Sequence, residues 1–216
     1  MELAIFDMDG TLLDSMWAWY DSPNRVIESL GFTPDEECRD LFRNKGYSGA
    51  AKFIVSHFGL DIEWQKVKRM LHDSVIPSYY EGLEFKPGAR EYLENLKEKG
   101  IRCCILTSNS HEILKIAENR FHLDRYFEDI WTIFDYGMKK SDRDIYSVIE
   151  ARTGISRKDM VLFEDYIFAI EAAGEAGLRT VGILEDCNTE YHESMKAAAT
   201  RTISSYQELL DDDIFR

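Results

Sequence analysis

Long apolar runs are absent from this sequence of 216 residues. No stretch reaches the ~20 consecutive apolar residues that a helix needs to cross a bilayer. The amino terminus also lacks a charged leader followed by an extended apolar segment, which is the pattern of a secretory signal peptide. These absences predict a cytoplasmic protein with no membrane partner.

Positive charge is scarce. The chain carries 26 Lys and Arg against 40 Asp and Glu, a formal net charge of −14. Because nucleic acids and anionic membranes are bound by clustered Lys and Arg, this balance argues against both as partners. The segment from Ser15 to Tyr80 is nearly neutral, with 9 acidic and 8 basic residues, so the negative excess lies outside it. The acidic run from Asp211 to Asp213 is predicted to be a solvated end.

Cysteine and histidine are few and scattered. The four cysteines form no CxxC pair, and adjacent Cys103 and Cys104 are expected to point to opposite faces of a strand. We therefore predict buried free thiols rather than disulfides or a zinc site. The five histidines show no metal-ligand spacing and are given no role: they are His57, His72, His111, His122 and His192.

What the chain does contain is a regular alternation of apolar runs and amphipathic segments. The apolar runs predict strands at 3–6, 101–106, 130–134, 160–163 and 180–184. The amphipathic segments predict helices at 89–99, 111–121, 142–153 and 168–176. Strands alternating with helices indicate parallel βαβ units, and hence an α/β fold with a Rossmann-like, doubly wound parallel sheet.

The stretch after the first strand has a different character. Strand-like runs are absent there, and three glycines divide it into about four helices: Gly31, Gly46 and Gly59. Thr33 followed by Pro34 predicts a capping box with proline at the first helical position. We expect residues 15–81 to form a small inserted helical domain, and residues 1–14 and 82–216 to form the α/β core.

Polar side chains end three of the predicted strands. The first strand ends at Asp7, the second at Thr107-Ser108-Asn109, and a later one at Glu164-Asp165. Lys139-Lys140 lies in a loop between the last two. In open α/β sheets ligands bind at the carboxyl ends of strands, where the strand order reverses. We therefore expect these side chains to converge on one edge of the sheet.

Each of these groups suits the transfer of a phosphoryl group. A carboxylate is a competent nucleophile toward phosphorus and gives an acyl phosphate that water can cleave. Magnesium takes oxygen ligands from one or two carboxylates and from substrate phosphate, which fits Asp7 and Asp165. A Lys and a Thr would hold phosphoryl oxygens. Asp9, two residues after Asp7, has the spacing of a general acid and base, and backbone amides near Gly10 and Ser108 add donors.

This set of motifs resembles that of the haloacid dehalogenase superfamily, in its branch of phosphatases and β-phosphoglucomutase-like proteins with a helical cap. The first motif of that family, DxDGT, matches Asp7 to Thr11. The second, an apolar strand that ends in Ser or Thr, matches Ile105 to Thr107. The resemblance covers nearly the whole chain, and the helical segment corresponds to the inserted cap of the family.

The third motif matches only in part, whereas the fourth is present. The third is a lysine usually followed by Pro-x-Pro-x-x-Tyr or Phe; here Lys140 and Tyr146 are kept but both prolines are missing, which leaves Lys139 as an alternative. The fourth, an acidic pair after a strand, is Glu164-Asp165.

The resemblance implies a role for each matched residue. Asp7 is the nucleophile and a metal ligand. Asp9 is the general acid and base, and its backbone carbonyl also ligates magnesium. Asp165 is a metal ligand, which Glu164 supports directly or through water. The residues that hold the phosphoryl group are Thr107, Ser108 and Lys140.

The cap offers candidates for substrate selection. In relatives with such a cap, a turn between cap helices reaches the active site, and Lys45 and Tyr47 lie in a predicted turn of this kind. Trp17 follows the first motif closely and is a further candidate. Two simpler interpretations stand beside these: a solvated loop lysine for Lys45, and helix core for the aromatic residues Trp17, Trp19 and Tyr20.

The activity that the resemblance implies is magnesium-dependent hydrolysis of a small phosphorylated metabolite, a sugar phosphate or a nucleoside monophosphate, through an aspartyl phosphate. A mutase of the β-phosphoglucomutase kind is the closest alternative. A phosphonatase would need a cap lysine that forms a Schiff base, Lys45 or Lys52. A dehalogenase is disfavoured because those relatives lack the second acid of the first motif, here Asp9. A non-catalytic metabolite-binding or regulatory protein would be expected to have lost these acids, which are intact.

Overall fold

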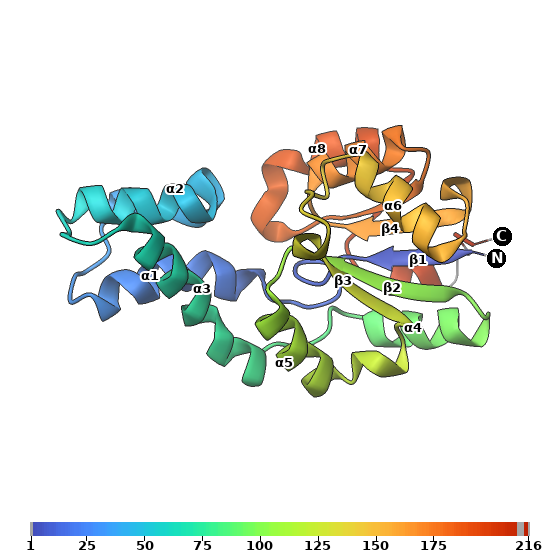
Figure 1. Cartoon of the computed structure of the whole chain (residues 1–216), viewed down its shortest axis with the longest axis horizontal. Coiled ribbons are helices and arrows are strands. Elements are labelled where there is room, and N and C mark those ends of the chain that lie inside the picture. Colours follow the sequence, from blue (N-terminus) through green and yellow to red (C-terminus); the bar gives the residue numbers. More distant parts are fainter. Residues whose placement is uncertain (1, 211–213, 216) are drawn as a thin grey trace. The chain divides into compact units, whose positions relative to one another are not determined.

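The computed structural model describes residues 2–210 and 214–215, so the acidic run at 211–213 lies outside the described residues. Contacts divide the chain into two compact units (Figure 1). The α/β unit consists of Met1–Asp14 and Glu84–Arg216, and the helical unit of Ser15–Leu83. The sequence placed the second border two residues earlier, between 81 and 82. A cap role for the helical unit stays a prediction.

The α/β unit is built on a parallel sheet of six strands in the order β3-β2-β1-β4-β5-β6. The strands are β1 (Leu3–Phe6), β2 (Arg102–Thr107), β3 (Asp129–Thr132), β4 (Met160–Glu164), β5 (Arg179–Ile183) and β6 (Arg201–Ile203). Chain order runs outward from β1 through β2 to β3 on one side and from β4 to β6 on the other, which confirms the predicted doubly wound sheet. The short strand β6 was not predicted.

Helices cover both faces of this sheet. They are α4 (Ala89–Glu98), α5 (His111–Phe121), α6 (Asp144–Thr153), α7 (Ile167–Glu175), α8 (His192–Ala198) and the short α9 (Gln207–Leu210). Figure 1 shows α4 and α5 on one face and α6, α7 and α8 on the other. No helix of the described part of the chain is long and apolar enough to cross a membrane.

The central strands are continuous apolar runs because both faces of the sheet are buried there. Every residue of β1 and of β4 is buried. Alternate side chains of β1 enter different parts of the core, because successive side chains of a strand point to opposite faces. Ile5 lies in one apolar cluster with Ile145 and Leu162, whereas Phe6 stacks on Phe163 with ring centroids 4.3 Å apart.

The helical unit has an apolar core of its own. It contains α1 (Met16–Ser29), the 3-10 turn η1 (Glu36–Cys38), α2 (Leu41–His57) and α3 (Trp64–Tyr80). Gly46 interrupts α2 with a non-helical backbone (φ 60°, ψ −178°), so the expected four helices are obtained only if α2 is counted as two. Lys45 and Tyr47 therefore flank a break inside α2.

The predicted capping box at Thr33 is wrong. The capping residue is Asp35, whose carboxylate accepts hydrogen bonds from the N–H groups of Glu37 and Cys38. Its extended backbone (φ −104°, ψ −173°) brings the side chain to these two donors, and the element that it starts is a turn of only three residues. Pro34 thus precedes the cap instead of following it.

Replacement of Gly88 should reveal how tightly the start of α4 packs against the start of α9. Gly88 has φ +77°, and a Cβ there would lie 2.7 Å from the backbone nitrogen of Gln207. Gly100 has φ +69° but open space around it. We expect Gly100→Ala to lower the free energy of unfolding by about 1–2 kcal/mol from backbone strain alone. Gly88→Ala should lose a further ~1–3 kcal/mol from the clash. Urea denaturation measures both; equal losses would contradict the contact with Gln207.

Candidate active site

The candidate site lies at the carboxyl ends of neighbouring strands in the α/β unit. Asp7 follows β1, Thr107 ends β2, and Glu164 ends β4 with Asp165 directly after it. Because β1 is flanked by β2 and β4, these three strand ends are adjacent, at the point where the strand order reverses. The N–H of Asp7 donates to the carbonyl of Phe163 at 2.9 Å, which continues the ladder one residue beyond β1 and anchors the Asp7 backbone.

A buried lysine joins two of these acids. The ammonium of Lys140 forms ion pairs with the carboxylates of Asp7 and Glu164, the latter at 2.9 Å. The side chains of Lys140, Asp7 and Glu164 are 5%, 9% and 1% exposed. Lys139 is exposed, so Lys140 is the lysine that the fold brings to Asp7. The Tyr146 hydroxyl donates to the Lys140 carbonyl at 2.9 Å and so holds the loop that lacks the two prolines.

The three acids of the site are close enough to share one ion. One carboxylate oxygen from each of Asp7, Glu164 and Asp165 lies within 4.8 Å of the other two, and all three residues are buried. Two oxygens bound to one magnesium ion at ~2.0–2.1 Å lie at most ~4.2 Å apart, so small side-chain movements suffice. A set of oxygen donors alone suits a hard divalent cation, and these residues therefore fit magnesium.

Burial dominates the electrostatics of this cluster. Burial and the nearby Glu164 carboxylate raise the pKa of Asp7 well above its usual value. Burial also raises the pKa of Glu164 to about 7 and, with the charge of Asp7, that of Asp165 to about 7. Burial acts to lower the pKa of Lys140, but the carboxylates of Asp7 and Glu164 outweigh it, and the net shift is upward. Three carboxyl groups thus face one permanent ammonium. A divalent cation would balance the negative charge that the ammonium leaves uncompensated.

Asp9 is held by a residue to which the sequence assigned no role. The side-chain amide of Asn109 donates to the carboxylate of Asp9. Asn109 is 7% exposed, its N–H donates to the Thr107 hydroxyl at 3.1 Å, and its carbonyl accepts from the Thr132 hydroxyl at 2.6 Å. The available signal was its position two residues after Thr107, at the same strand end. Thr11, also unassigned, donates to Asp165 at 3.5 Å.

The remaining predicted residues lie elsewhere. Ser108 is exposed just after β2. In the helical unit, Trp17 is 44% exposed, and the Lys45 ammonium lies 5.4 Å from the centre of the Phe53 ring. Tyr47 packs edge-on against the buried Trp19, with centroids 5.5 Å apart. A role of Trp17, Lys45 and Tyr47 in substrate selection stays a prediction.

Comparison with known proteins agrees with this arrangement. The haloacid dehalogenase-like hydrolase family matches residues 4–183. A phosphorylated carbohydrates phosphatase of Thermotoga maritima is 28% identical, over 87% of this chain and 88% of the relative. A phosphoglycolate phosphatase of Agrobacterium fabrum is 31% identical, over 84% of this chain and 79% of the relative.

A solved structure is similar over nearly its full length. It is that of a proposed β-phosphoglucomutase from Thermotoga maritima, with a TM-score of 0.80 and 27% identity, covering 98% of this chain and 97% of that one. Together with the family match, the acids and threonine at the strand ends and the buried lysine beside them identify this chain as a member of the haloacid dehalogenase-like hydrolase family.

Proposed function

We propose that the protein is a magnesium-dependent phosphatase that hydrolyses a small phosphorylated metabolite through an aspartyl phosphate on Asp7. The observation that carries the proposal is the buried ion pair between Lys140 and Asp7, beside Glu164 and Asp165. A nucleophilic carboxylate, a fixed ammonium for phosphoryl oxygens and an oxygen-only metal site are the three requirements of this chemistry. The phosphatase names of two relatives support the same reaction class.

In the first step, a carboxylate oxygen of Asp7 attacks phosphorus, and the bond between phosphorus and the alcohol oxygen of the substrate breaks. Asp9 gives its proton to the departing oxygen. In the second step, Asp9 takes a proton from water, whose oxygen attacks phosphorus. The bond between phosphorus and Asp7 then breaks, which releases inorganic phosphate and restores the carboxylate. Asn109 orients the Asp9 carboxylate for both transfers.

Other residues of the chain hold the charge of the phosphoryl group. Lys140 and the Thr107 hydroxyl would bind its oxygens, together with backbone amides near Ser108. Magnesium would be held by Asp7, Asp165 and the Asp9 carbonyl, with Glu164 binding directly or through water. When bound, it neutralises the carboxylates and the substrate phosphate, which could not otherwise approach each other.

For the substrate, we favour a phosphorylated carbohydrate over a nucleoside monophosphate, because a relative covering most of the chain acts on phosphorylated carbohydrates by name. The similar β-phosphoglucomutase structure supports a second candidate, a phosphosugar mutase. A mutase returns the phosphoryl group to a second hydroxyl of the sugar and requires a sugar bisphosphate. Release of inorganic phosphate without a bisphosphate therefore separates the two.

Replacement of the nucleophile tests the reaction class. Asp7→Asn should lower magnesium-dependent phosphate release from a panel of phosphorylated sugars and nucleotides by at least ~10³-fold, because the amide cannot form the acyl phosphate. Phosphate release is measured with and without magnesium, and circular dichroism checks that the variant folds. Equal turnover by Asp7→Asn and wild type would rule out the aspartyl phosphate. No release by folded wild type, with isomerisation of a sugar phosphate when bisphosphate is added, would favour the mutase.

The two neighbouring lysines form a matched pair for a second test. Lys140→Met should lower kcat/KM by about 100-fold or more, because the phosphoryl oxygens lose a buried ammonium. Lys139→Met should stay within about twofold of wild type, because that side chain is exposed. Steady-state kinetics on the best substrate of the panel measures both values. A larger loss in Lys139→Met would assign the phosphate contact to Lys139.

The raised carboxyl pKa values predict how magnesium affects stability at different pH. Glu164 and Asp165 have pKa values near 7 in the folded chain, above the ordinary carboxyl range. The metal-free protein should therefore lose stability as the pH rises from about 4.5 to 7, since the folded state binds more protons than the unfolded state. Magnesium replaces those protons, so its increase of Tm should be larger at pH 8 than at pH 5.5, as followed by thermal denaturation. Asp165→Asn should remove most of this difference.

A further inference from the structure

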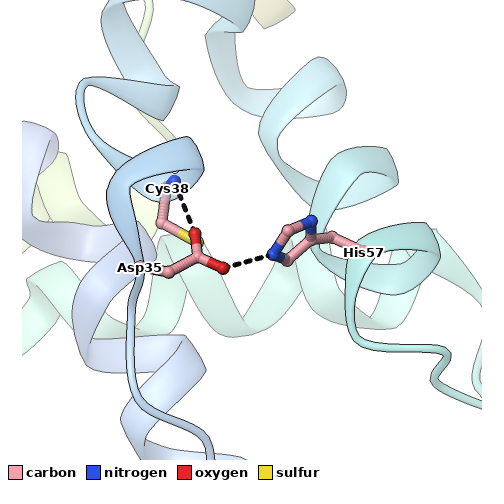
Figure 2. Close-up of side chains that lie close together, drawn as sticks. All are labelled: Asp35, Cys38 and His57. Carbon is pink, nitrogen blue, oxygen red and sulfur yellow. Dashed lines mark hydrogen bonds and ion pairs between the residues drawn. The ribbon is translucent and has the colours of Figure 1, made fainter.

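Outside the acid cluster, three side chains of different chemistry meet within the helical unit. Asp35 caps η1, Cys38 is the last residue of that turn, and His57 is the last residue of α2. One oxygen, one sulfur and one ring nitrogen from these residues all lie within 4.8 Å of one another. Figure 2 shows the Asp35 carboxylate between the Cys38 backbone and the His57 ring. The proposed phosphatase mechanism uses none of the three.

The surroundings orient these donors. One oxygen of Asp35 accepts N–H hydrogen bonds from the turn, and the other lies 2.7 Å from Nε2 of His57 (Figure 2). The His57 ring stacks on Phe53, with centroids 4.7 Å apart, and meets Phe58 edge-on at 4.8 Å. A carboxylate fixed by backbone amides and an imidazole fixed by two rings lose little freedom when they bind an ion.

The spacing and the kind of donors suit zinc and its chemical relatives. Zinc binds sulfur at ~2.3 Å and nitrogen or oxygen at ~2.0–2.2 Å in tetrahedral geometry, so two ligands of one ion lie roughly 3.3–3.7 Å apart. The three donors lie within 4.8 Å of one another, so small side-chain movements would bring them to that spacing. A thiol with an imidazole favours a borderline-soft cation over magnesium, whose preferred ligands are all oxygen. A fourth donor is near, because a Glu37 oxygen lies 3.9 Å from Nδ1 of His57 on a side chain that is 74% exposed.

Simpler roles account for part of the cluster. Capping of η1 and a hydrogen bond explain the Asp35 and His57 contacts, and burial in the core of the helical unit explains an apolar environment for Cys38. Neither role requires a thiol within ligand distance of both partners. Cys38 is buried, with 2% of its surface exposed, whereas the Asp35 side chain is 50% exposed. An ion could therefore enter past the exposed Asp35 carboxylate and bind the buried sulfur of Cys38.

We propose that Asp35, Cys38 and His57 form a binding site for a zinc-class divalent cation, with Glu37 or water as the fourth ligand. On binding, the Cys38 thiol releases its proton to water and the sulfur binds as thiolate, while His57 binds through an unprotonated ring nitrogen. The ion links η1 to the far end of α2, the helix that follows it. Its expected effect is to stabilise the helical unit rather than to take part in phosphoryl transfer.

Cobalt(II) in place of zinc gives a direct readout, because a thiolate bound to cobalt produces a charge-transfer absorption band that an oxygen-only site cannot produce. The whole protein is freed of metal with a chelator and titrated with cobalt in saturating magnesium, which occupies the acid cluster. We expect the band to saturate at one equivalent and to disappear when zinc is added. Absence of the band in folded wild-type protein would overturn the proposal.

Three variants assign the ligands. Cys38→Ser should abolish the band, whereas Cys187→Ser, which removes a partly buried thiol outside this cluster, should keep it. Should Cys38→Ser fail to fold, Asp35→Asn provides the second test, since asparagine caps a helical turn equally well but is a weaker metal ligand. It should weaken cobalt binding about tenfold or more while preserving the circular dichroism spectrum. A band lost in Cys187→Ser, or unchanged cobalt affinity in Asp35→Asn, would refute this site.

Discussion

The site depends on a single electrostatic constraint, which is that three carboxyl groups and one ammonium are buried together at the strand ends. Lys140 pairs with Asp7 and Glu164 in a place where neither acid is appreciably exposed. An isolated buried charge is strongly unfavourable, and removing one partner of a buried pair leaves the other uncompensated. The sheet fixes the backbones of Asp7 and Glu164, and Tyr146 fixes that of the lysine. The unbalanced negative charge that remains is what makes the site receptive to a cation.

A further set of hydrogen bonds holds the side chain of Asp9 in place. Asn109 contacts Asp9 and is itself held by Thr132 at the end of β3. The Thr132 N–H donates to Asp135, and Asp135 lies 2.9 Å from the ring of His111 at the start of α5. The proposed acid and base is therefore linked to a neighbouring strand and helix, so its orientation depends on the packing of that whole edge of the sheet.

The helical unit follows a different principle, since its helices pack around a separate apolar core. Its cluster of Asp35, Cys38 and His57 combines soft and hard donors, whereas the strand-end cluster has oxygen donors only. The two sites would therefore select different cations by ligand chemistry alone. A stabilising ion in the small unit would compensate for its limited core, because small domains bury a lower fraction of their surface.

The sequence by itself determined the fold class, five of the strands and the presence of a helical insertion. It could do so because apolar runs of four to six residues and the DxDGT motif are local signals that neighbouring residues suffice to define. It missed β6, whose three residues carry too little pattern to distinguish a strand. It also assigned the residue that caps the turn η1 to Thr33 instead of Asp35. Both side chains offer a capping oxygen, and they lie only two positions apart.

Only the tertiary structure decided which side chains meet. The sequence favoured Lys140 by its spacing to Tyr146 but left Lys139 as an alternative, and the direction in which the loop turns buries Lys140 and exposes Lys139. Asn109 gave no spacing signal because its partner, Asp9, is distant along the chain, and His57 gave none because its contact with Cys38 depends on how α2 packs against η1. Contacts of this kind arise from strand order and helix packing, which depend on the whole chain, whereas a motif records only the order of adjacent residues.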